Sequence, residues 1–362
     1  MRSRRSQIIQ GVISLFVVVA IFWFVLPKIA DFGEVWRTIK AMTGLEIGVL
    51  AVVAAFNIWT YLPLNMSVLP GLRMGEAFVA NNASTAVANT LPAGGALGVG
   101  VNFAFFRSWG FENAAITLAL LVAGVLNTFV KLGLPIVALT ILAVGGDASG
   151  ALMTAAIVGL LILVVAVTLF AAMLKTDALA RRVGDGLGAC MNFGRRLIRR
   201  PPVTGSGQRA VNFRHEAVAL LRKRGWYAAG ATVLSHLSLY LVLVVSLRQV
   251  GVSEDEVSWA VVLAAFAFGR LLTALPITPG GLGVIELGYV VALSVGMDDR
   301  TTAQITAAVL VFRALTYIPP IFIGAGCYGF WQHNKSWRHP VGSRPSLATP
   351  TTDSPSHRPA PT

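Results

Sequence analysis

The sequence Thr278-Pro279-Gly280-Gly281 decides the fold, because it breaks an otherwise apolar stretch that runs from Glu256 to Gly296. Leu91-Pro92-Ala93-Gly94-Gly95 breaks a second apolar stretch, from Glu76 to Arg107, in the same way. The helical arm after each break is short, about 14 Å for residues 99–107 and about 20 Å for residues 284–296. Neither arm crosses the ~30 Å hydrocarbon core of a bilayer. We therefore expect each stretch to form a re-entrant hairpin of two half-helices, surrounded by protein or by a watery cavity.

Composition places both breaks in an integral membrane protein. Hydrophobic residues make up 55% of the 362 residues and charged residues only 12%, whereas soluble domains carry about 25% charged residues. A cleaved signal peptide is the alternative for the first apolar run, but no A-x-A-like site follows that run. The apolar runs long enough to span a bilayer predict six transmembrane helices, at about residues 8–26, 45–69, 114–144, 151–174, 226–247 and 302–331.

The formal net charge of +13 fits a membrane topology better than a nucleic-acid partner. The basic residues cluster between apolar runs, as the positive-inside rule requires, and no nucleic-acid-binding motif accompanies them. With the N-terminus in the cytoplasm, 21 of the 29 Lys and Arg residues fall on the cytoplasmic side. We expect a single transmembrane domain over residues 1–331 in the plasma (cytoplasmic) membrane, with both termini cytoplasmic.

Two polar segments belong to the cytoplasmic side of this topology. Residues 175–224 form a basic loop, whose first part has the pattern of an amphipathic helix on a membrane surface; the alternative is charge that only sets topology. Residues 332–362 are rich in Pro, Ser and Thr, so they cannot bury a core and are expected to be a disordered tail.

An internal repeat relates the two broken stretches. Pro92 aligns with Pro279 at an offset of 187, residues 108–113 with 294–299 at 186, and Pro135 with Pro320 at 185. Three predicted spans separate the hairpins, so the second copy is inverted, with halves at about 8–146 and 150–331. The prediction is an inverted 3+3 repeat, which many transporters use to build a site at the midplane. Chance similarity between Gly- and Pro-rich apolar segments is the alternative.

The breaks supply the first candidate binding residues: Pro92, Gly94, Gly95, Pro279, Gly280 and Gly281. A half-helix begins after each break, and its free N–H groups and positive dipole end point at the break. Such an end binds phosphate or carboxylate, and glycine lets a ligand approach the backbone closely. The alternative is that these glycines serve only tight packing of the hairpins.

Charged residues inside apolar stretches are the sharper candidates, because each costs roughly 2.5–3.5 kcal/mol to insert unless it is paired or solvated. Arg270 and Glu286 lie on the two arms of the second hairpin and can pair or flank a cavity. Arg313 lies near the middle of the last span, and Lys131 at a comparable depth in the third. Three cations against one carboxylate suit an anionic headgroup. Local pairing, or snorkelling to an interface, is the alternative, and the one we favour for Lys131.

Other polar residues are candidates for lining a path through the membrane. Asn81, Asn89 and Asn127 are unusual on lipid-facing helices and join Lys131 and His236 in this group; hydrogen bonding between helices is the alternative. A lone His such as His236 is more often packed and hydrogen-bonded than a proton relay. No Walker loop, HExxH or G-x-S-x-G motif occurs, and the two cysteines lack metal-ligand spacing. We expect no enzyme activity, metal or cofactor.

The segments Asn89-Thr90-Leu91-Pro92-Ala93-Gly94-Gly95 and Pro276-Ile277-Thr278-Pro279-Gly280-Gly281-Leu282-Gly283-Val284-Ile285-Glu286 resemble the paired signatures of the flippase-type membrane domain of lysylphosphatidylglycerol synthases. The resemblance covers about residues 8–331. In many relatives a Glu follows the first Gly pair, where Gly98-Val99-Gly100 stands here. The aminoacyl-transferase domain of the full synthases is absent, so no lysyl-lipid synthesis is implied.

The resemblance implies an all-α polytopic membrane protein that moves a phospholipid or a polyprenyl-phosphate-linked sugar between leaflets. Two alternatives stay open: a secondary transporter of a small anion, and a non-transporting scaffold in which Arg270 and Glu286 are simply paired. The expected partners are membrane lipids, bound through an anionic headgroup or lipid phosphate. Two protein partners stay open: a second copy of the chain, and a separate lipid-modifying enzyme.

Overall fold

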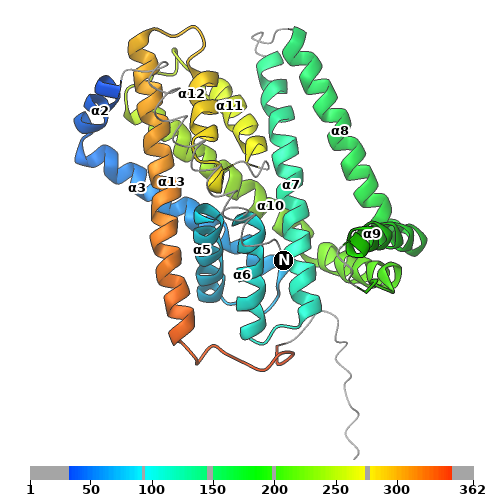
Figure 1. Cartoon of the computed structure of the whole chain (residues 1–362). Helices are drawn as coiled ribbons and strands as arrows, with labels where there is room; N and C mark the ends of the chain where they lie inside the picture. The colour runs from blue at the N-terminus through cyan, green and yellow to red at the C-terminus, as the bar shows by residue number, and fades with distance from the viewer. Residues whose placement is uncertain (1–31, 92–93, 145–149, 198–200, 274–277, 345–362) are drawn as a thin grey trace, which may run out of the picture.

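The computed structural model describes residues 32–91, 94–144, 150–197, 201–273 and 278–344, and in this part of the chain the secondary structure is helical, without strands (Figure 1). The predicted first helix, residues 8–26, lies outside it. The helices are α2 (Phe32–Ala41), α3 (Gly44–Thr60), α4 (Leu62–Val68), α5 (Met74–Thr90), α6 (Gly94–Ser108), α7 (Asn113–Val144), α8 (Gly150–Lys175), α9 (Asp177–Leu197), α10 (Ser206–Gln249), α11 (Trp259–Leu272), the 3-10 turn η3 (Pro279–Gly281), α12 (Val284–Leu293) and α13 (Asp299–His333).

Long apolar helices confirm a polytopic membrane protein. Among the described residues, four are long and apolar enough to cross a bilayer: residues 44–68, α7, α10 and α13. The first of these is interrupted between α3 and α4, where Pro63 stands in the first turn of α4 and cannot donate an N–H to the preceding turn. A fifth candidate consists of α8 and α9 together, which are bent by 110° at the junction between them.

The outer surface of these helices is apolar. Leu45 is 79% exposed, Phe322 74% and Val144 86%. Large apolar side chains with this exposure would be a liability in water, and a bilayer removes them from it. The predicted spans at 45–69, 114–144, 226–247 and 302–331 coincide with these helices.

The helix starts follow local sequence signals. Thr43 and Glu46 form a capping box at α3, and Ser258 accepts from the backbone N–H of Val261 at α11. Asp298 caps α13 by accepting from the N–H of Thr301 at 2.7 Å. This hydrogen bond holds the pKa of the exposed Asp298 carboxyl below its usual value, because it stabilises the charged form.

Both broken stretches are helix–break–helix elements. The arms are 17 residues for α5, 15 for α6, 14 for α11 and 10 for α12, all shorter than the ~20 residues needed to span a bilayer. One boundary differs from the prediction, because α6 begins at Gly94 rather than near Val99. Leu91 accepts from the N–H of Gly94 at 2.9 Å, so the helix restarts directly after the break.

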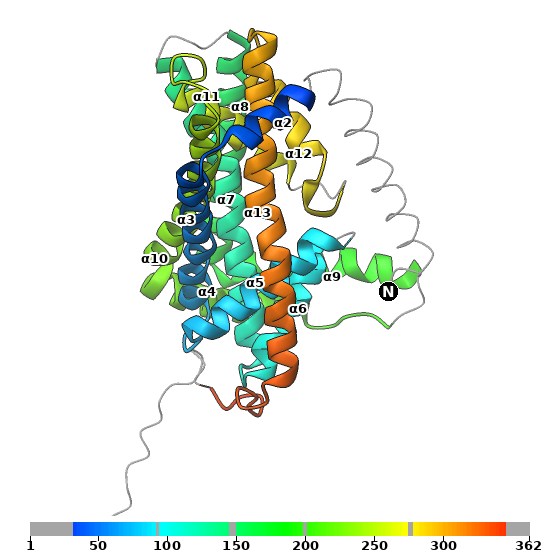
Figure 2. The same ribbon diagram turned by 90° about the vertical axis from the view of Figure 1, so that its left-hand side faces the viewer.

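The two broken stretches are followed by matching elements. After α6 and α12 the chain turns through Gly110 (φ +92°) and Gly296 (φ +76°), both in the left-handed region that glycine tolerates. The long helices α7 and α13 then carry Pro135 and Pro320 in their interiors. Figures 1 and 2 show α5 and α6 in the lower half of the molecule and α11 and α12 in the upper half, with α13 running along both.

The described buried core has two main clusters, one around each broken stretch. The upper cluster joins α7, α10, α11, α12 and α13 around Phe266, Tyr289 and Phe312. The lower cluster joins α4, α5, α6, α7 and α10 around Phe105, Trp109 and Phe111. Both cores therefore include α7 and α10, which tie the two broken stretches together.

The basic segment, residues 175–224, is largely helical: α9 agrees with the amphipathic helical pattern of its first part, whereas the expected loop is corrected where α10 begins at Ser206. It contains α9 and the first part of α10, which lie against each other. Arg214 of α10 holds the corner between α8 and α9 by donating to the carbonyl oxygens of Leu174 and Lys175 and to the carboxylate of Asp177. The amphipathic pattern of residues 175–200, rather than their high charge, decided the local structure.

The tail predicted to be disordered from Gln332 is ordered as far as Arg344, a second correction. His339 donates from its N–H to the carbonyl of Ser108 at 3.0 Å, and Gly342 donates to that of Gly110 at 2.9 Å. Arg344 forms an ion pair with Glu76, which is 1% exposed. A buried carboxylate needs such a partner, and composition alone does not reveal that the partner lies in the tail.

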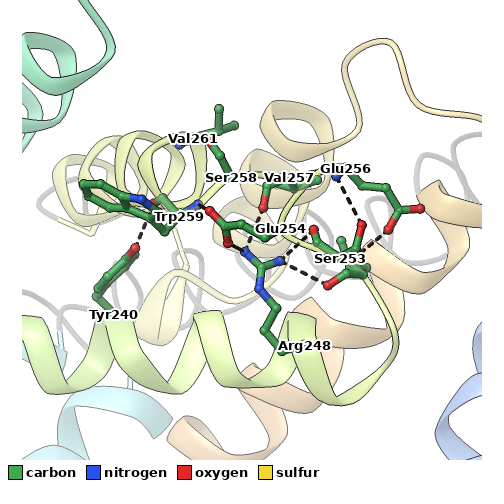
Figure 3. Close-up of polar contacts among 10 residues, drawn as sticks. Tyr240, Arg248, Ser253, Glu254, Glu256, Val257, Ser258, Trp259 and Val261 are labelled. Carbon is green, nitrogen blue, oxygen red and sulfur yellow. Dashed lines mark hydrogen bonds and ion pairs between the residues drawn. The ribbon is translucent and has the colours of Figure 1, made fainter. Parts of the chain in front are cut away.

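Arg248 organises the turn between α10 and α11 (Figure 3). Its Nη1 donates to the carbonyl oxygens of Val252 at 3.1 Å and Ser253 at 3.0 Å, and its Nη2 to that of Val257 at 2.8 Å. Nη2 also pairs with Glu254. One planar guanidinium therefore satisfies three backbone carbonyls of the turn.

We expect Arg248→Ala to lower the free energy of unfolding by about 1.5–3 kcal/mol, the usual cost of losing hydrogen bonds to a charged group. Arg248→Lys should recover only part of this, because an ammonium lacks the rigid fork of donors. Thermal unfolding of the detergent-purified protein measures the difference, and Arg300→Ala, an exposed position in the next turn, is the control. Wild-type stability of Arg248→Lys would contradict the role of the fork.

Candidate functional site

The two breaks of the chain meet in the structure. Gly280 adopts a left-handed conformation (φ +59°), and a Cβ there would lie 2.5 Å from Cε2 of Tyr317 and 3.2 Å from Oδ1 of Asn89. The hydroxyl of Tyr317 donates to the carbonyl oxygen of Asn89. Asn89 ends α5 just before the first break, so the second break packs against the start of the first.

A buried ion pair stands beside this contact. Nε of Arg313 donates to Oε1 of Glu286 at 2.6 Å, and its Nη2 donates to the carbonyl oxygen of Gly280 at 3.1 Å. The side chain of Glu286 is 1% exposed and that of Arg313 14%. The guanidinium also lies 5.0 Å from the ring centre of Tyr317, a cation–π contact. One residue of α13 thus joins α12, the turn η3 and its own next turn.

The ion pair shows which cation Glu286 contacts, where the sequence left open whether Glu286 pairs with Arg270 or flanks a cavity with it. Glu286 pairs with Arg313 of α13, and no hydrogen bond or ion pair joins it to Arg270 among the described residues. The other oxygen of Glu286, Oε2, is buried and has no hydrogen-bond partner in this part of the chain. The carboxylate is therefore only half satisfied.

Arg270 instead belongs to a cationic cluster, which we define as Lys131 of α7, His236 of α10 and Arg270 of α11. Nη2 of Arg270 lies 3.4 Å from Nε2 of His236. Nδ1 of His236 lies 3.0 Å from the carbonyl oxygen of Thr232, which can only accept, so Nδ1 carries the proton and Nε2 accepts from Arg270. Lys131 belongs to α7, which packs against both α10 and α11.

The cationic cluster has no carboxylate among the described residues. The ion pairs of that part of the chain leave out both Lys131 and Arg270, and Nε of Arg270 is buried without a hydrogen-bond partner there. His236 is 1% exposed and positions Arg270, which fits its expected packed role. Two positive charges at depth are thus left for a ligand or for water.

Tyr289 connects the cationic cluster with the ion pair. Its ring is 2% exposed, and a Cβ at Gly269 would lie 2.3 Å from its Cε1, so α11 and α12 approach closely at this point. Tyr289 lies three residues after Glu286 on α12, and its ring contacts that of Phe312, which directly precedes Arg313 on α13. The charged residues predicted from the sequence therefore gather in one region of the fold.

The candidate glycines divide into three kinds. Gly94 is buried, and a Cβ there would lie 2.3 Å from the carbonyl oxygen of Ala88, so Gly94 is needed for packing α6 on α5. Gly95 has no atom within 4 Å of its Cβ position and leaves the backbone open. Gly280 and Gly281, which follow Pro279 in η3, both have positive φ and form the turn itself. Pro92 lies outside the described residues.

Two predicted path-lining residues form hydrogen bonds within one helix or between neighbouring helices. Asn127 donates to the carbonyl of Ala123 at 2.9 Å within α7. Oδ1 of Asn81 accepts from Asn65 of α4 at 3.4 Å. Both fit hydrogen bonding within or between helices, whereas Asn89 and Lys131 lie at the meeting of the breaks and in the cationic cluster.

Sequence reasoning missed Tyr317 and Tyr289. Tyr317 follows Arg313 by four residues on one helix, a spacing that places the two side chains on the same face, and this signal was available. Tyr289 has no comparable signal, because its role depends on the approach of α11 to α12. No group of three His, Cys, Asp or Glu residues suited to a metal ion occurs in the described part of the chain.

These features define a class: an all-α polytopic membrane protein in which two broken helices meet beside buried charges. The model of one protein family, described as the lysylphosphatidylglycerol synthase TM region, matches residues 11–324. The chain belongs to this family, and the resemblance of its paired motifs is confirmed. No curated protein matches the chain.

Proposed function

We propose that the protein is a lipid flippase, which moves a phosphate-bearing lipid between the leaflets of the plasma membrane. One observation carries the proposal: Lys131 and Arg270 lie on two membrane helices that pack against each other, α7 and α11, and neither has a carboxylate partner in the described part of the chain. Cations at such depth are costly unless they are paired or solvated. A phospholipid or a polyprenyl-phosphate-linked sugar brings the missing negative charge with it.

An inverted repeat gives this site access from both sides in turn. Its support is the matching order of α5–α6–α7 and α11–α12–α13 and the placement of the two broken stretches in opposite halves of the molecule. In this proposal the first hairpin enters the membrane from the cytoplasm and the second from outside. Both termini are cytoplasmic, and the protein catalyses no covalent reaction.

Within the site the cations have different roles. Arg313 is neutralised by Glu286 and holds the second break in place through Gly280. Arg270 and Lys131 then contact the lipid phosphate, while His236 orients Arg270. The open backbone at Gly95 offers N–H groups of the first turn of α6, which suit an anion.

The test is lipid movement in liposomes that contain the purified protein, followed with fluorescent phospholipid and a membrane-impermeant quencher. We expect Arg270→Gln and Lys131→Gln each to slow translocation about tenfold or more, since a hydrogen bond to a charged group contributes roughly 1.5–3 kcal/mol. Arg107→Gln, which removes an exposed charge at the end of α6, is the matched control.

Two results would overturn the proposal. Wild-type translocation in both cluster variants would remove the cationic cluster from the transport path. Uptake of inorganic phosphate into the same liposomes, with no lipid movement, would instead identify a small-anion transporter. Parallel runs with phosphatidylglycerol, phosphatidylcholine and a polyprenyl phosphate separate the lipid classes.

A further inference from the structure

A second candidate site lies on the lipid-facing surface of the helices and does not include the buried charges. It is an apolar groove of about 540 Å³, which we call the α5–α13 groove. Its walls come from Trp59 of α3, Phe78 of α5, Cys327 and Phe330 of α13, and Trp337 of the segment that follows α13. The volume falls within the ~300–1,000 Å³ range of small-molecule sites.

The apolar walls of the groove favour a hydrocarbon chain as the ligand. The groove offers almost no polar surface and is open to the outside, so a polar solute gains no hydrogen bonds there. The flanking helices are membrane spans, and Trp59 is 51% exposed on the same surface. An acyl chain of a lipid fills such a groove without leaving a polar group unsatisfied.

Basic residues mark one end of the groove. Arg73 directly precedes Met74, which lines the groove, and Lys335 and Arg338 flank Trp337. These segments are in contact, because a Cβ at Gly75 would lie 3.3 Å from Cη2 of Trp337. The side chains of Arg73, Lys335 and Arg338 are all exposed. The nearby carboxylate of Glu76 is buried and paired with Arg344, so it does not cancel this charge.

We propose that the α5–α13 groove binds one anionic phospholipid, with an acyl chain in the groove and its phosphate at Arg73 and Lys335. Juxtamembrane Lys and Arg residues attract anionic lipid, and aromatic side chains such as Trp337 are typical of the membrane–water interface. The groove begins at Ile323, about 9 Å along α13 from Tyr317. The inference therefore does not depend on transport at the buried charges.

Glycines of α13 provide a matched pair of variants. Gly326 lines the groove, and Gly329 does not; neither has any atom within 4 Å of its Cβ position. Gly326→Phe therefore puts a ring into the groove without a backbone clash at its Cβ, and Gly329→Phe adds the same ring elsewhere on the helix.

The experiment is native mass spectrometry of the full chain, titrated with phosphatidylglycerol or phosphatidylcholine. We expect the wild type and Gly329→Phe to retain one phosphatidylglycerol in preference to phosphatidylcholine, and Gly326→Phe to lose at least tenfold in its retention. Arg73→Gln combined with Lys335→Gln should abolish the preference between the two lipids. In an Arg270→Gln background, which alters the proposed transport site, Gly326→Phe should lower retention by the same factor as in the wild type.

A second measurement does not depend on whether the Gly326→Phe variant folds. In a Cys190→Ser background Cys327, which lines the groove, is the one remaining thiol. We expect phosphatidylglycerol to slow its modification by a maleimide more than phosphatidylcholine does. Equal protection by both lipids, unchanged retention in Gly326→Phe, or a lipid-free dimer that Gly326→Phe dissociates would overturn the proposal.

Discussion

Glu286→Gln should lower the free energy of unfolding by about 3–5 kcal/mol, the cost of removing one partner of a buried ion pair. Arg313 would keep the carbonyl of Gly280 and the ring of Tyr317 but would lose its countercharge. Because the Glu286 side chain is 1% exposed, water cannot take the place of the carboxylate. Thermal unfolding of the detergent-purified protein measures the loss, and Arg107→Gln at an exposed position is the control.

The double variant Glu286→Leu with Arg313→Met separates charge from packing. Removing both charges leaves no uncompensated ion, so we expect it to be more stable than Glu286→Gln alone. Lipid translocation should nevertheless fail in the double variant, because Arg313 no longer holds Gly280 beside Asn89. If Glu286→Gln unfolds like the wild type, the pair does not stabilise the fold.

Local pattern was enough to predict the helix–break–helix elements. A proline followed closely by two glycines strongly disfavours continuous helix, so the breaks near Gly94 and Gly280 could be placed within a few residues. Apolar runs predict spans because every backbone group in a bilayer must be paired within the chain. Both signals depend on short stretches of sequence, and neither needs knowledge of what packs against them.

The partners of the charged residues could not be predicted in this way. Glu286 had two available cations, Arg270 and Arg313, and the choice depends on which face of α12 meets α13. Arg344 and Glu76 are 268 positions apart, and the tail composition around Arg344 is typical of disorder. For residues 201–224 the basic composition likewise suggested a loop, but α10 begins there at Ser206.

Gly280→Ala should disturb the meeting of the two breaks more than any other single methyl group we can place there. A left-handed conformation costs a non-glycine residue roughly 1–2 kcal/mol, and the new Cβ would lie 2.5 Å from Tyr317, which adds about 1–3 kcal/mol of overpacking. The melting temperature in detergent should fall accordingly. Gly100→Ala is the matched control, because Gly100 is helical and its Cβ position is open, so this change should be neutral or slightly stabilising.

A third variant tests whether the loss of stability in Gly280→Ala comes from the contact of the new methyl group with Tyr317. If the added methyl group acts by pushing Tyr317 away from Asn89, then Tyr317→Leu should cost stability on its own but should make Gly280→Ala much less damaging. Residues in contact show such non-additivity, typically about 0.5–3 kcal/mol, whereas distant ones add. Strict additivity would mean that the backbone conformation of Gly280 carries the whole effect. Coupling would show that the second break holds its place by packing against the end of α5.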